Sequence, residues 1–388
     1  MRPHPVQQIA LVGVAESDLG KVPGKTAIQL AAEASRAALE DAGLKKSDVD
    51  GLFTFGFGRM GAVQFGEYLQ IQPRYSDSST MGGSTPVAFV QHAAAAISAG
   101  LCSVALVAYG STQASDAQRR FGGQPEDLRL PGSQYERPFG IPLPLGAYAL
   151  AATRHMAVYG TTSEQLAEIA VATRRWAQLN PVAMMREPLT IQDVLSSRLI
   201  ASPLHLLDCC LVTDGGGAAV LTTLERAQDL KKAPVVVLGT AETHTHQIIS
   251  QMPDLTVTGA ALTGPRAFAM AGLAPSEVDV AEIYDSFTIT VLLTLEDLGF
   301  CKKGEGGAFV SGQRTAPGGE FPLNTQGGGL SYCHPGVFGV FTLIEGVRQL
   351  RGECGPRQVA GCEVALVHGT GGALGNRHSG ATLVLGKS

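Results

Sequence analysis

The chain has 388 residues, of which 45% are hydrophobic and 16% charged, enough for two ordinary domains or one large duplicated domain. A net charge of −5 and a pI near 6.0 give no global basic field, which excludes nucleic acid as an expected partner. No apolar run approaches the ~18 residues of a membrane span, and residues 1–17 have too short an apolar core for a signal peptide, so we expect neither.

The seven cysteines predict neither a metal site nor a disulfide framework. Their number is odd, no pair has the CxxC spacing of zinc ligands, and Cys209 and Cys210 are adjacent. This usage is typical of a reducing compartment, so we expect a cytoplasmic protein without a bound metal.

The first 100 residues predict strands and two helices. An apolar strand, "IALVGVAES", is followed by an amphipathic helix, "TAIQLAAEASRAALEDAG", which should end at Gly43. A second helix, "TPVAFVQHAAAAISAG", should have Thr85 as its N-cap and Pro86 at its first position. It is rich in alanine and apolar on all sides, so we expect it to be buried.

Two segments of the chain match each other in order. "LVGVAES" (11–17) resembles "VLGTAET" (237–243), and "AGLKKSDVDGLF" (42–53) resembles "AGLAPSEVDVAEI" (271–283). Near the end of each segment come "VALVAYGS" and "VALVHGTGG". We therefore predict a duplicated α/β chain with halves 1–230 and 231–388. Residues 112–200 have no counterpart in the second half and read as an inserted, mostly helical lobe.

Five motifs together resemble the thiolase superfamily, most of all its sterol-carrier-protein type: "IALVGVAES", "PLHLLDCCLVTDGGGAAVLTT", "EIYDSF", "CHPGVFG" and "VHGTGG". Each motif is weak alone, but the set spans nearly the whole chain. The resemblance implies a thiolase-like fold, with duplicated βαβαβαββ halves in a five-layered αβαβα sandwich. It also implies a CoA thioester substrate.

Thiolases attack with a cysteine at the N-terminus of the first buried helix, where the helix dipole favours a thiolate. Counting back from "AAISAG" places that position at Gly83, and no cysteine lies there. The nearest one, Cys102, lies beyond the other end of the helix, ~20 Å or more away at 1.5 Å per residue. Covalent acyl-cysteine chemistry is therefore not expected.

The resemblance and the residues that remain give three catalytic candidates. His334 matches the histidine of the family's H-P-x-G turn, and the helix after this turn is expected to begin near Pro335. Tyr332 lies two residues before His334, and Tyr284 stands where sterol-carrier-type thiolases have a histidine. A neutral tyrosine can donate a hydrogen bond to an oxyanion. The alternative to a catalytic role is a packed aromatic residue for each tyrosine and a structural turn residue for His334.

Other residues of the same loops receive lesser roles. His368 and Gly371 lie in the loop that matches the family's C-terminal glycine loop, and we assign them to substrate binding together with Ser84. Cys333 replaces a usual glycine and is not expected to be a nucleophile. Asp285, and Ser286 beside it, are read as N-caps of the helix at 286–300, "SFTITVLLTLEDLGF".

A retro-aldol cleavage needs a CoA thioester pocket and acid–base groups but no acyl-enzyme. Thiolase-fold aldolases of bacterial steroid side-chain degradation catalyse it, and in that branch two tyrosines are implicated. The resemblance therefore predicts a lyase that cleaves a 17-hydroxy steroid 20-carboxyl-CoA to a 17-ketosteroid and propionyl-CoA. The alternatives are a non-catalytic subunit that binds acyl-CoA or sterol, and an acyltransferase that works without an acyl-cysteine.

The same branch implies a small partner protein with an OB-fold of the zinc-ribbon type, and a homodimer core within a heterotetramer. No cofactor is expected beyond the CoA that the substrate carries. Arg174 and Arg175, and also Arg119 and Arg120, are basic pairs that suit CoA phosphates. A solvated helix face explains them equally simply, so we leave them unassigned.

Overall fold

Nine of the strands that the computed structural model describes form one mixed sheet, and β5 (Leu199–Ala201) and β6 (Leu204–His205) form a separate two-stranded sheet. The described residues are 4–116, 128–141, 144–371 and 379–388. In sheet order the strands are β3 (Tyr75–Asp77), β2 (Gly51–Thr54), β4 (Val104–Ser111), β7 (Gly215–Thr223), β1 (Ile9–Glu16), β8 (Val235–His244), β11 (Ser379–Lys387), β10 (Val364–Gly371) and β9 (Val280–Ile283). β1 and β8 pair over only two residues each, which divides the sheet into two halves.

The second half of the sheet repeats the first. Outward from β1 come β7, antiparallel to β1, then β4, antiparallel to β7, and then β2, which is parallel to β4. Outward from β8 come β11 and β10, again antiparallel, and then β9, which is parallel to β10. Where the first half has β3, the second has a parallel bridge from Ala281 to Leu323. The predicted duplication is confirmed.

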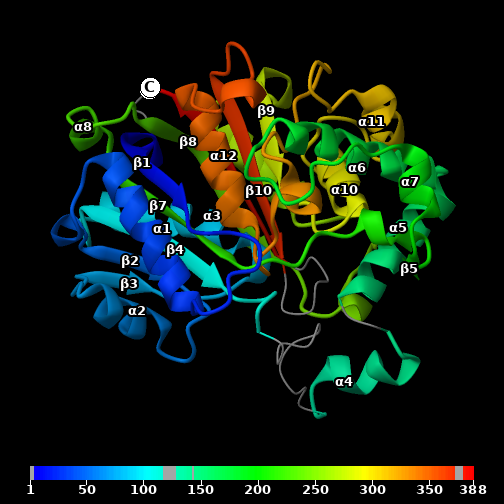
Figure 1. Ribbon diagram of the computed structural model, residues 1–388, viewed down its shortest axis with the longest axis horizontal. Coiled ribbons are helices and arrows are strands. Elements are labelled where there is room, and N and C mark those ends of the chain that lie inside the picture. Colours follow the sequence, from blue (N-terminus) through cyan, green and yellow to red (C-terminus); the bar gives the residue numbers. More distant parts are fainter. Residues whose placement is uncertain (1–3, 117–127, 142–143, 372–378) are drawn as a thin grey trace.

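Two central helices lie between the halves of the sheet (Figure 1). α3 (Thr85–Ser98) and α12 (Gly339–Arg351) each contact strands of both halves, whereas α1 (Ala27–Ala42) covers the outside of the first half and α9 (Ala260–Ala271) the outside of the second. This is the predicted five-layered arrangement. It differs from two separate sheets in one respect, because the short β1–β8 ladder joins the halves edge to edge.

Matching glycines show that the outer helices pack in the same way in both halves. A Cβ added at Gly13 on β1 would lie 2.1 Å from the carbonyl oxygen of Ala38 on α1. A Cβ added at Gly239 on β8 would lie 2.1 Å from the carbonyl oxygen of Ala267 on α9. These two glycines occupy the same place in the repeated sequence, so each lets an outer helix approach its strand closely.

The predicted boundaries of the central helices need correction. Ser84, not Thr85, is the N-cap of α3, and the Thr85 hydroxyl instead accepts from the Met81 N–H and donates to the Gly82 carbonyl, both at 2.8 Å. α12 begins at Gly339, four residues after the predicted start near Pro335. The reason is that Gly336 has a φ of +84°, in the left-handed region, which is not helical. The end of α1 at Gly43, in the left-handed region, is as predicted.

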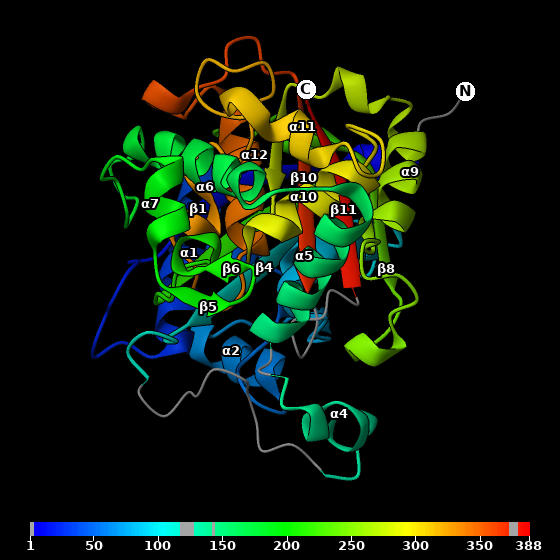
Figure 2. The same cartoon turned by 90° about the vertical axis from the view of Figure 1, so that its right-hand side faces the viewer.

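The predicted inserted lobe lies between β4 and β7 and is mostly helical. Helices α5 (Leu145–Tyr159) and α6 (Ser163–Gln178) contact α10 (Thr288–Asp297) of the second half. Helix α4 (Pro131–Tyr135) lies at the edge of the molecule in both views (Figure 1, Figure 2), and its C-cap residue Glu136 accepts a hydrogen bond from the Ser250 N–H at 2.6 Å. The remaining elements are α2 (Gly61–Leu69), α7 (Ile191–Ser196), α8 (Leu224–Ala227) and α11 (Gly306–Val310). The division of the chain into domains near residue 230 stays a prediction. None of the described helices combines the length and the apolar character needed to cross a bilayer.

His92 on α3 ties the two halves together. Its Nδ1 lies 2.6 Å from Asp77 on β3, and its Nε2 lies 3.0 Å from Glu242 on β8. The hydrogen bond to Asp77 and the one to Glu242 raise the pKa of His92 from 6.5 to about 9, and the bond to His92 lowers the pKa of Asp77 to about 2. At neutral pH His92 is therefore a partly buried cation between the carboxylates of Asp77 and Glu242.

We predict that His92→Gln destabilises the fold in a pH-dependent way. A histidine with a raised folded-state pKa stabilises the fold fully below pH ~6.5, and this contribution is lost as the pH rises through about 9. The free energy of unfolding should therefore fall by about 1–3 kcal/mol at pH 6 and much less at pH 9.5. Chemical denaturation of both proteins at the two pH values measures this, and an equal deficit at both would show that the His92 charge is not responsible.

Candidate active site

Tyr332 ends a single π-helical turn, Gly328–Tyr332, which we call the catalytic turn and which leads through the extended Cys333 to His334. The Asp285 carboxylate holds it by accepting hydrogen bonds from the Gly329 N–H at 2.6 Å and the Leu330 N–H at 3.2 Å. Asp285 is fully buried, and burial raises its pKa to about 7. The carboxylate thus fixes the backbone from which the candidate side chains project.

The prediction that Asp285 and Ser286 cap a helix is wrong. The N-cap of α10 is Phe287, and no side chain accepts a capping bond there. Asp285 turns to the glycine-rich turn instead, and the Ser286 hydroxyl lies 3.1 Å from that of Thr290. The Ser331 and Tyr332 N–H groups of the turn bond to the Gly327 carbonyl, and the Asp285 carboxylate satisfies the N–H groups of Gly329 and Leu330 between them.

The inserted lobe holds the turn from the other side. Arg174 on α6 donates through Nε to the Ser331 hydroxyl at 2.8 Å and through Nη1 to the Glu187 carbonyl at 3.0 Å. Arg174 is buried, so its guanidinium serves the turn and does not face a solvent-borne phosphate. Arg175 is exposed, and the other basic pair, 119–120, lies outside the described residues.

The side chains of Tyr284 and His334, two of the three catalytic candidates, are in contact. The tyrosine oxygen lies 2.9 Å from Nε2 of the imidazole, and the two rings cross at 80°. The His334 backbone is fixed by Thr213, whose hydroxyl accepts from the His334 N–H at 3.0 Å. Burial lowers the pKa of His334 to about 4 and raises the pKa of Tyr284 well above 10. At neutral pH the pair is an uncharged phenol hydrogen-bonded to an uncharged imidazole.

Gly83 packs directly against this pair. A Cβ added at Gly83 would lie 2.8 Å from two ring atoms of Tyr284 and 2.3 Å from the carbonyl oxygen of Thr370. Gly371 approaches from β10, where an added Cβ would lie 2.1 Å from the Gly83 nitrogen. The ring of Tyr284 therefore occupies the space that a side chain at the nucleophile position would need, and a cysteine there is sterically excluded.

Tyr332 makes a separate contact. Its hydroxyl donates to Glu16 Oε1 at 2.9 Å, and Arg348 on α12 binds both carboxylate oxygens of Glu16, at 2.6 and 2.5 Å. Burial would raise the pKa of Glu16, but the charge and hydrogen bonds of Arg348 outweigh it and lower that pKa. The sequence reasoning missed Glu16 and Arg348, although Glu16 lies in the repeated motif "VAES" and matches Glu242 in the second copy.

The structure directs the His368 side chain away from the Tyr284–His334 pair, which corrects its assignment, although the His368 backbone carbonyl accepts a hydrogen bond from the Tyr284 N–H at 2.9 Å. Side chains alternate along a strand, and Gly369 and Gly371 of β10 face the central helix α3. His368 therefore faces the outer side, where its Nδ1 lies 2.8 Å from the Thr382 hydroxyl, which in turn bonds Thr263 of α9. Burial lowers the pKa of His368 to about 3.

Ser84 is close to Gly83, but its hydroxyl is already engaged. It lies 2.8 Å from the Ser379 hydroxyl and 3.2 Å from the Met81 carbonyl, and the side chain is fully buried. Ser84 therefore joins α3 to β11 and presents no free hydroxyl. Of the residues assigned to substrate binding, Gly371 packs against Gly83 beside the pair, and His368 contacts Tyr284 through its backbone carbonyl.

The cysteines of the described part of the chain are all free. Cys333 is fully buried, and burial raises the pKa of its thiol well above 9. Cys210, whose N–H donates to the Ser286 carbonyl, has its thiol pKa raised in the same way. Neither environment favours a thiolate. Among the described residues no three His, Cys, Asp or Glu side chains gather as metal ligands would.

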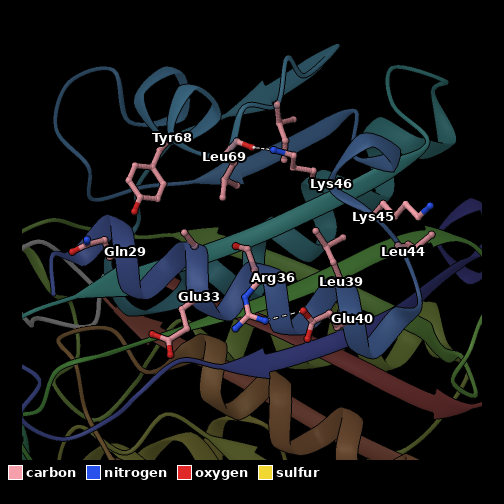
Figure 3. Close-up of a pocket in the computed structure, with 13 residues that line it drawn as sticks. Gln29, Glu33, Arg36, Leu39, Glu40, Leu44, Lys45, Lys46, Tyr68 and Leu69 are labelled. Carbon is pink, nitrogen blue, oxygen red and sulfur yellow. Dashed lines mark hydrogen bonds and ion pairs between the residues drawn. The ribbon is translucent and has the colours of Figure 1, made fainter.

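A surface depression of about 600 Å³ lies far from these residues, on the outer side of the first half (Figure 3). It is bounded by α1, by the segment after it and by α2, and its rim carries charges of both signs, such as the Arg36–Glu40 pair and Lys46. It shares no residue with the catalytic turn. The candidate site is therefore defined by the turn and its neighbours and not by this depression.

Comparison with known proteins identifies relatives along the whole chain. A family model described as "Thiolase C-terminal domain-like" matches residues 241–387. A 17-hydroxy-3-oxo-4-pregnene-20-carboxyl-CoA lyase of Mycobacterium tuberculosis is 38% identical over 94% of this chain and 97% of its own. An acetyl-CoA acetyltransferase of Methanothermobacter thermautotrophicus is 33% identical over 95% of this chain and 98% of its own. The solved structure of an Ltp2-ChsH2(DUF35) aldolase superposes with a TM-score of 0.89 at 33% identity, covering 98% of each chain.

We predict that Gly83→Ala disrupts the site more than the fold. The added methyl must displace either the Tyr284 ring or the β10 backbone, and the ring is the softer of the two. The hydrogen bond between Tyr284 and His334 should be lost, at a cost in stability of about 1–3 kcal/mol. A crystal structure and a melting curve of the variant test this, with Gly61→Ala, where an added Cβ meets only the Phe57 Cβ at 3.6 Å, as control. An unmoved Tyr284 ring in Gly83→Ala would refute the steric argument.

Proposed function

The chain belongs to the thiolase superfamily, and we propose that it is a carbon–carbon lyase of the aldolase type that cleaves a β-hydroxyacyl-CoA. The proposed substrate is a 17-hydroxy steroid 20-carboxyl-CoA, and the products are a 17-ketosteroid and propionyl-CoA. The names of the full-length lyase relative and of the solved aldolase support this reaction type.

The observation that carries the proposal is the replacement of the nucleophile by an acid–base pair. Tyr284 fills the space beside Gly83, and its hydroxyl is hydrogen-bonded to His334. A reaction in this site can therefore move protons but cannot form an acyl-cysteine at the family's nucleophile position. Retro-aldol cleavage has this requirement, since it proceeds by proton removal, bond cleavage and proton return.

The proposed reaction has three steps. A base takes the proton of the β-hydroxyl, the Cα–Cβ bond breaks with its electron pair moving into the thioester enolate, and an acid then protonates Cα. Tyr284, Tyr332 and His334 are the residues we propose for these steps. A neutral phenol or imidazole N–H beside the thioester oxygen stabilises the enolate without storing charge on the protein.

An acyltransferase is the second candidate, because one full-length relative is named an acetyl-CoA acetyltransferase. Transfer through an acyl-enzyme requires a nucleophile, and the packing around Gly83 leaves no room for one there. Ser84 next to it has its hydroxyl bonded to Ser379 and the Met81 carbonyl. The packing thus favours the lyase. A carrier without activity would need neither the Tyr284–His334 bond nor the carboxylate that fixes the turn.

The proposal includes a partner protein. The solved aldolase that this chain resembles is named as a complex with a DUF35 protein, and we propose that this chain also works with a small partner of the OB-fold, zinc-ribbon type around a homodimer core. It needs no cofactor other than the CoA of its substrate. A cytoplasmic location is part of the proposal and is supported by the free thiols.

The direct test is a product assay. Purified protein, alone and with the DUF35-type partner, is incubated with a 17-hydroxy steroid 20-carboxyl-CoA and, separately, with acetyl-CoA. Mass spectrometry should detect a 17-ketosteroid and propionyl-CoA in equal amounts from the first substrate. Formation of acetoacetyl-CoA from the second, without ketosteroid from the first, would make the protein an acyltransferase.

We predict that Tyr284→Phe lowers kcat by about 10² or more, because it removes the hydroxyl of an acid–base group. The fold should keep its melting temperature within a few degrees, since the ring still fills the space beside Gly83. Tyr75→Phe, which removes a hydroxyl from the edge strand β3, serves as control and should leave kcat unchanged. Cys333→Ala should retain most of the activity, and if it abolishes turnover in a folded protein, the reaction uses a thiol after all.

A further inference from the structure

Glu16 and Arg348 form a charged pair that the proposed reaction has not used. Glu16 ends β1, and Arg348 lies on the central helix α12 of the other half. The guanidinium binds both carboxylate oxygens, which is the strong, directional form of an ion pair. One of these oxygens also accepts the hydroxyl proton of Tyr332 at 2.9 Å, so the pair is attached to the catalytic turn.

The contact fixes the direction of the Tyr332 hydroxyl. A tyrosine has one proton to donate, and here it is directed at a carboxylate that Arg348 keeps ionised. The remaining lone pairs of the phenol oxygen can then only accept. Tyr284 lacks such a restriction, because its partner is a neutral imidazole, which is able to accept from it or donate to it.

Exposure to solvent increases from Tyr332 through Glu16 to Arg348. Tyr332 is 2% exposed, the Glu16 side chain 14% and the Arg348 side chain 25%. The hydrogen bond from Tyr332 to Glu16 therefore leads from the buried turn to a carboxylate that water reaches. A base that has taken up a proton must lose it again before the next turnover, and a water-accessible carboxylate allows this.

We propose, building on the lyase function above, that Glu16, held by Arg348, is a positioning residue. It makes the Tyr332 oxygen the acceptor of the substrate's β-hydroxyl proton and provides the path by which a proton then reaches water. When the substrate O–H bond breaks, its proton goes to the Tyr332 oxygen, and the Tyr332 proton goes to Glu16. The electron pair left on the substrate oxygen forms the ketone as the Cα–Cβ bond breaks. Glu16 then releases its proton to water, while the acid that protonates Cα regains one from water.

The charges around the pair agree with this role. Burial and the nearby negative charge of Glu16 raise the pKa of Tyr332 well above 10, so it stays a neutral phenol. Cys333 beside Tyr332 is also neutral, because burial raises its thiol pKa. Arg348 faces Glu16 and Tyr332 and feels the charge of Glu345 on the same helix. Glu16 is therefore the carboxylate in contact with Tyr332, and its removal should lower the Tyr332 pKa.

The test compares Glu16→Gln with Asp41→Asn. Asp41 is a matched control, because its carboxylate also binds an arginine of α12, Arg351 at 2.9 Å, and also contacts β1, but not a tyrosine. Glu16→Gln loses the partly exposed ion pair with Arg348, and Asp41→Asn loses the pair with Arg351 and a longer one with Lys232. Glu16→Gln should lower kcat by about tenfold or more with little change in KM. Asp41→Asn should lower the melting temperature comparably and leave kcat within about twofold.

A second readout does not depend on activity. Tyrosinate absorbance near 295 nm is followed against pH in the wild type, in Glu16→Gln and in each protein with Tyr332→Phe added, so that the difference reports Tyr332 alone. Tyr332 should ionise at lower pH when Glu16 is neutralised, and Glu16→Asp should restore the wild-type behaviour in part. If the wild type cleaves no β-hydroxyacyl-CoA, the lyase function fails, and the titration still decides whether Glu16 controls Tyr332. An unchanged titration together with an unchanged kcat in Glu16→Gln overturns the proposal.

Discussion

The site depends on one close approach of backbones, at Gly83. Gly371 of β10 and Gly339 of α12 both pack against it. A Cβ added at Gly371 would lie 2.1 Å from the Gly83 nitrogen, and a Cβ added at Gly339 would lie 2.5 Å from the Gly83 carbonyl oxygen. Three glycines at one point bring the tips of the two central helices and the end of a strand into contact. The Tyr284 ring closes the remaining side. The packing excludes a nucleophilic side chain at position 83. The Tyr284 ring that fills this space carries the hydroxyl that bonds to His334.

The duplication also gives the two halves their electrostatic ties. Glu16 and Glu242 occupy the same place in the repeated strand, and each reaches across to a cation on the central helix of the opposite half, Arg348 on α12 and His92 on α3. The cations differ, because His92 can lose its charge as the pH rises through about 9, whereas Arg348 stays charged. The tie that also contacts the candidate residue Tyr332 is the one whose charge is permanent, and Arg348 thereby holds the pKa of Glu16 below its usual range.

Much of the fold follows from the sequence, because repeated strands and outer helices leave periodic patterns. The Gly13–Gly239 match, the helix end at Gly43 and the missing cysteine are all readable along the chain. The positions of single side chains are not, because they depend on which face of a strand points inward and on partners hundreds of residues away. His368 was assigned to the site from its loop, but the alternation along β10 turns it to the outer side. The sequence favours Asp285 as a helix cap, but its carboxylate instead accepts hydrogen bonds from two N–H groups of a turn more than forty residues later. Glu16 was visible only as part of a repeat, since its partner Arg348 lies 332 residues away.

The electrostatic character of the site agrees with its proposed chemistry. Burial lowers the pKa of His334 and raises those of Tyr284, Tyr332, Cys210 and Cys333, so every one of these groups is held in its neutral form. An environment that penalises charge in this way would also raise the pKa of a cysteine at position 83 and weaken it as a nucleophile. The loss of the cysteine and the burial of the remaining groups therefore belong together. Once the site no longer needs a thiolate, it can be dry, and in a dry site hydrogen bonds from neutral donors to an enolate oxygen are stronger than they would be in water.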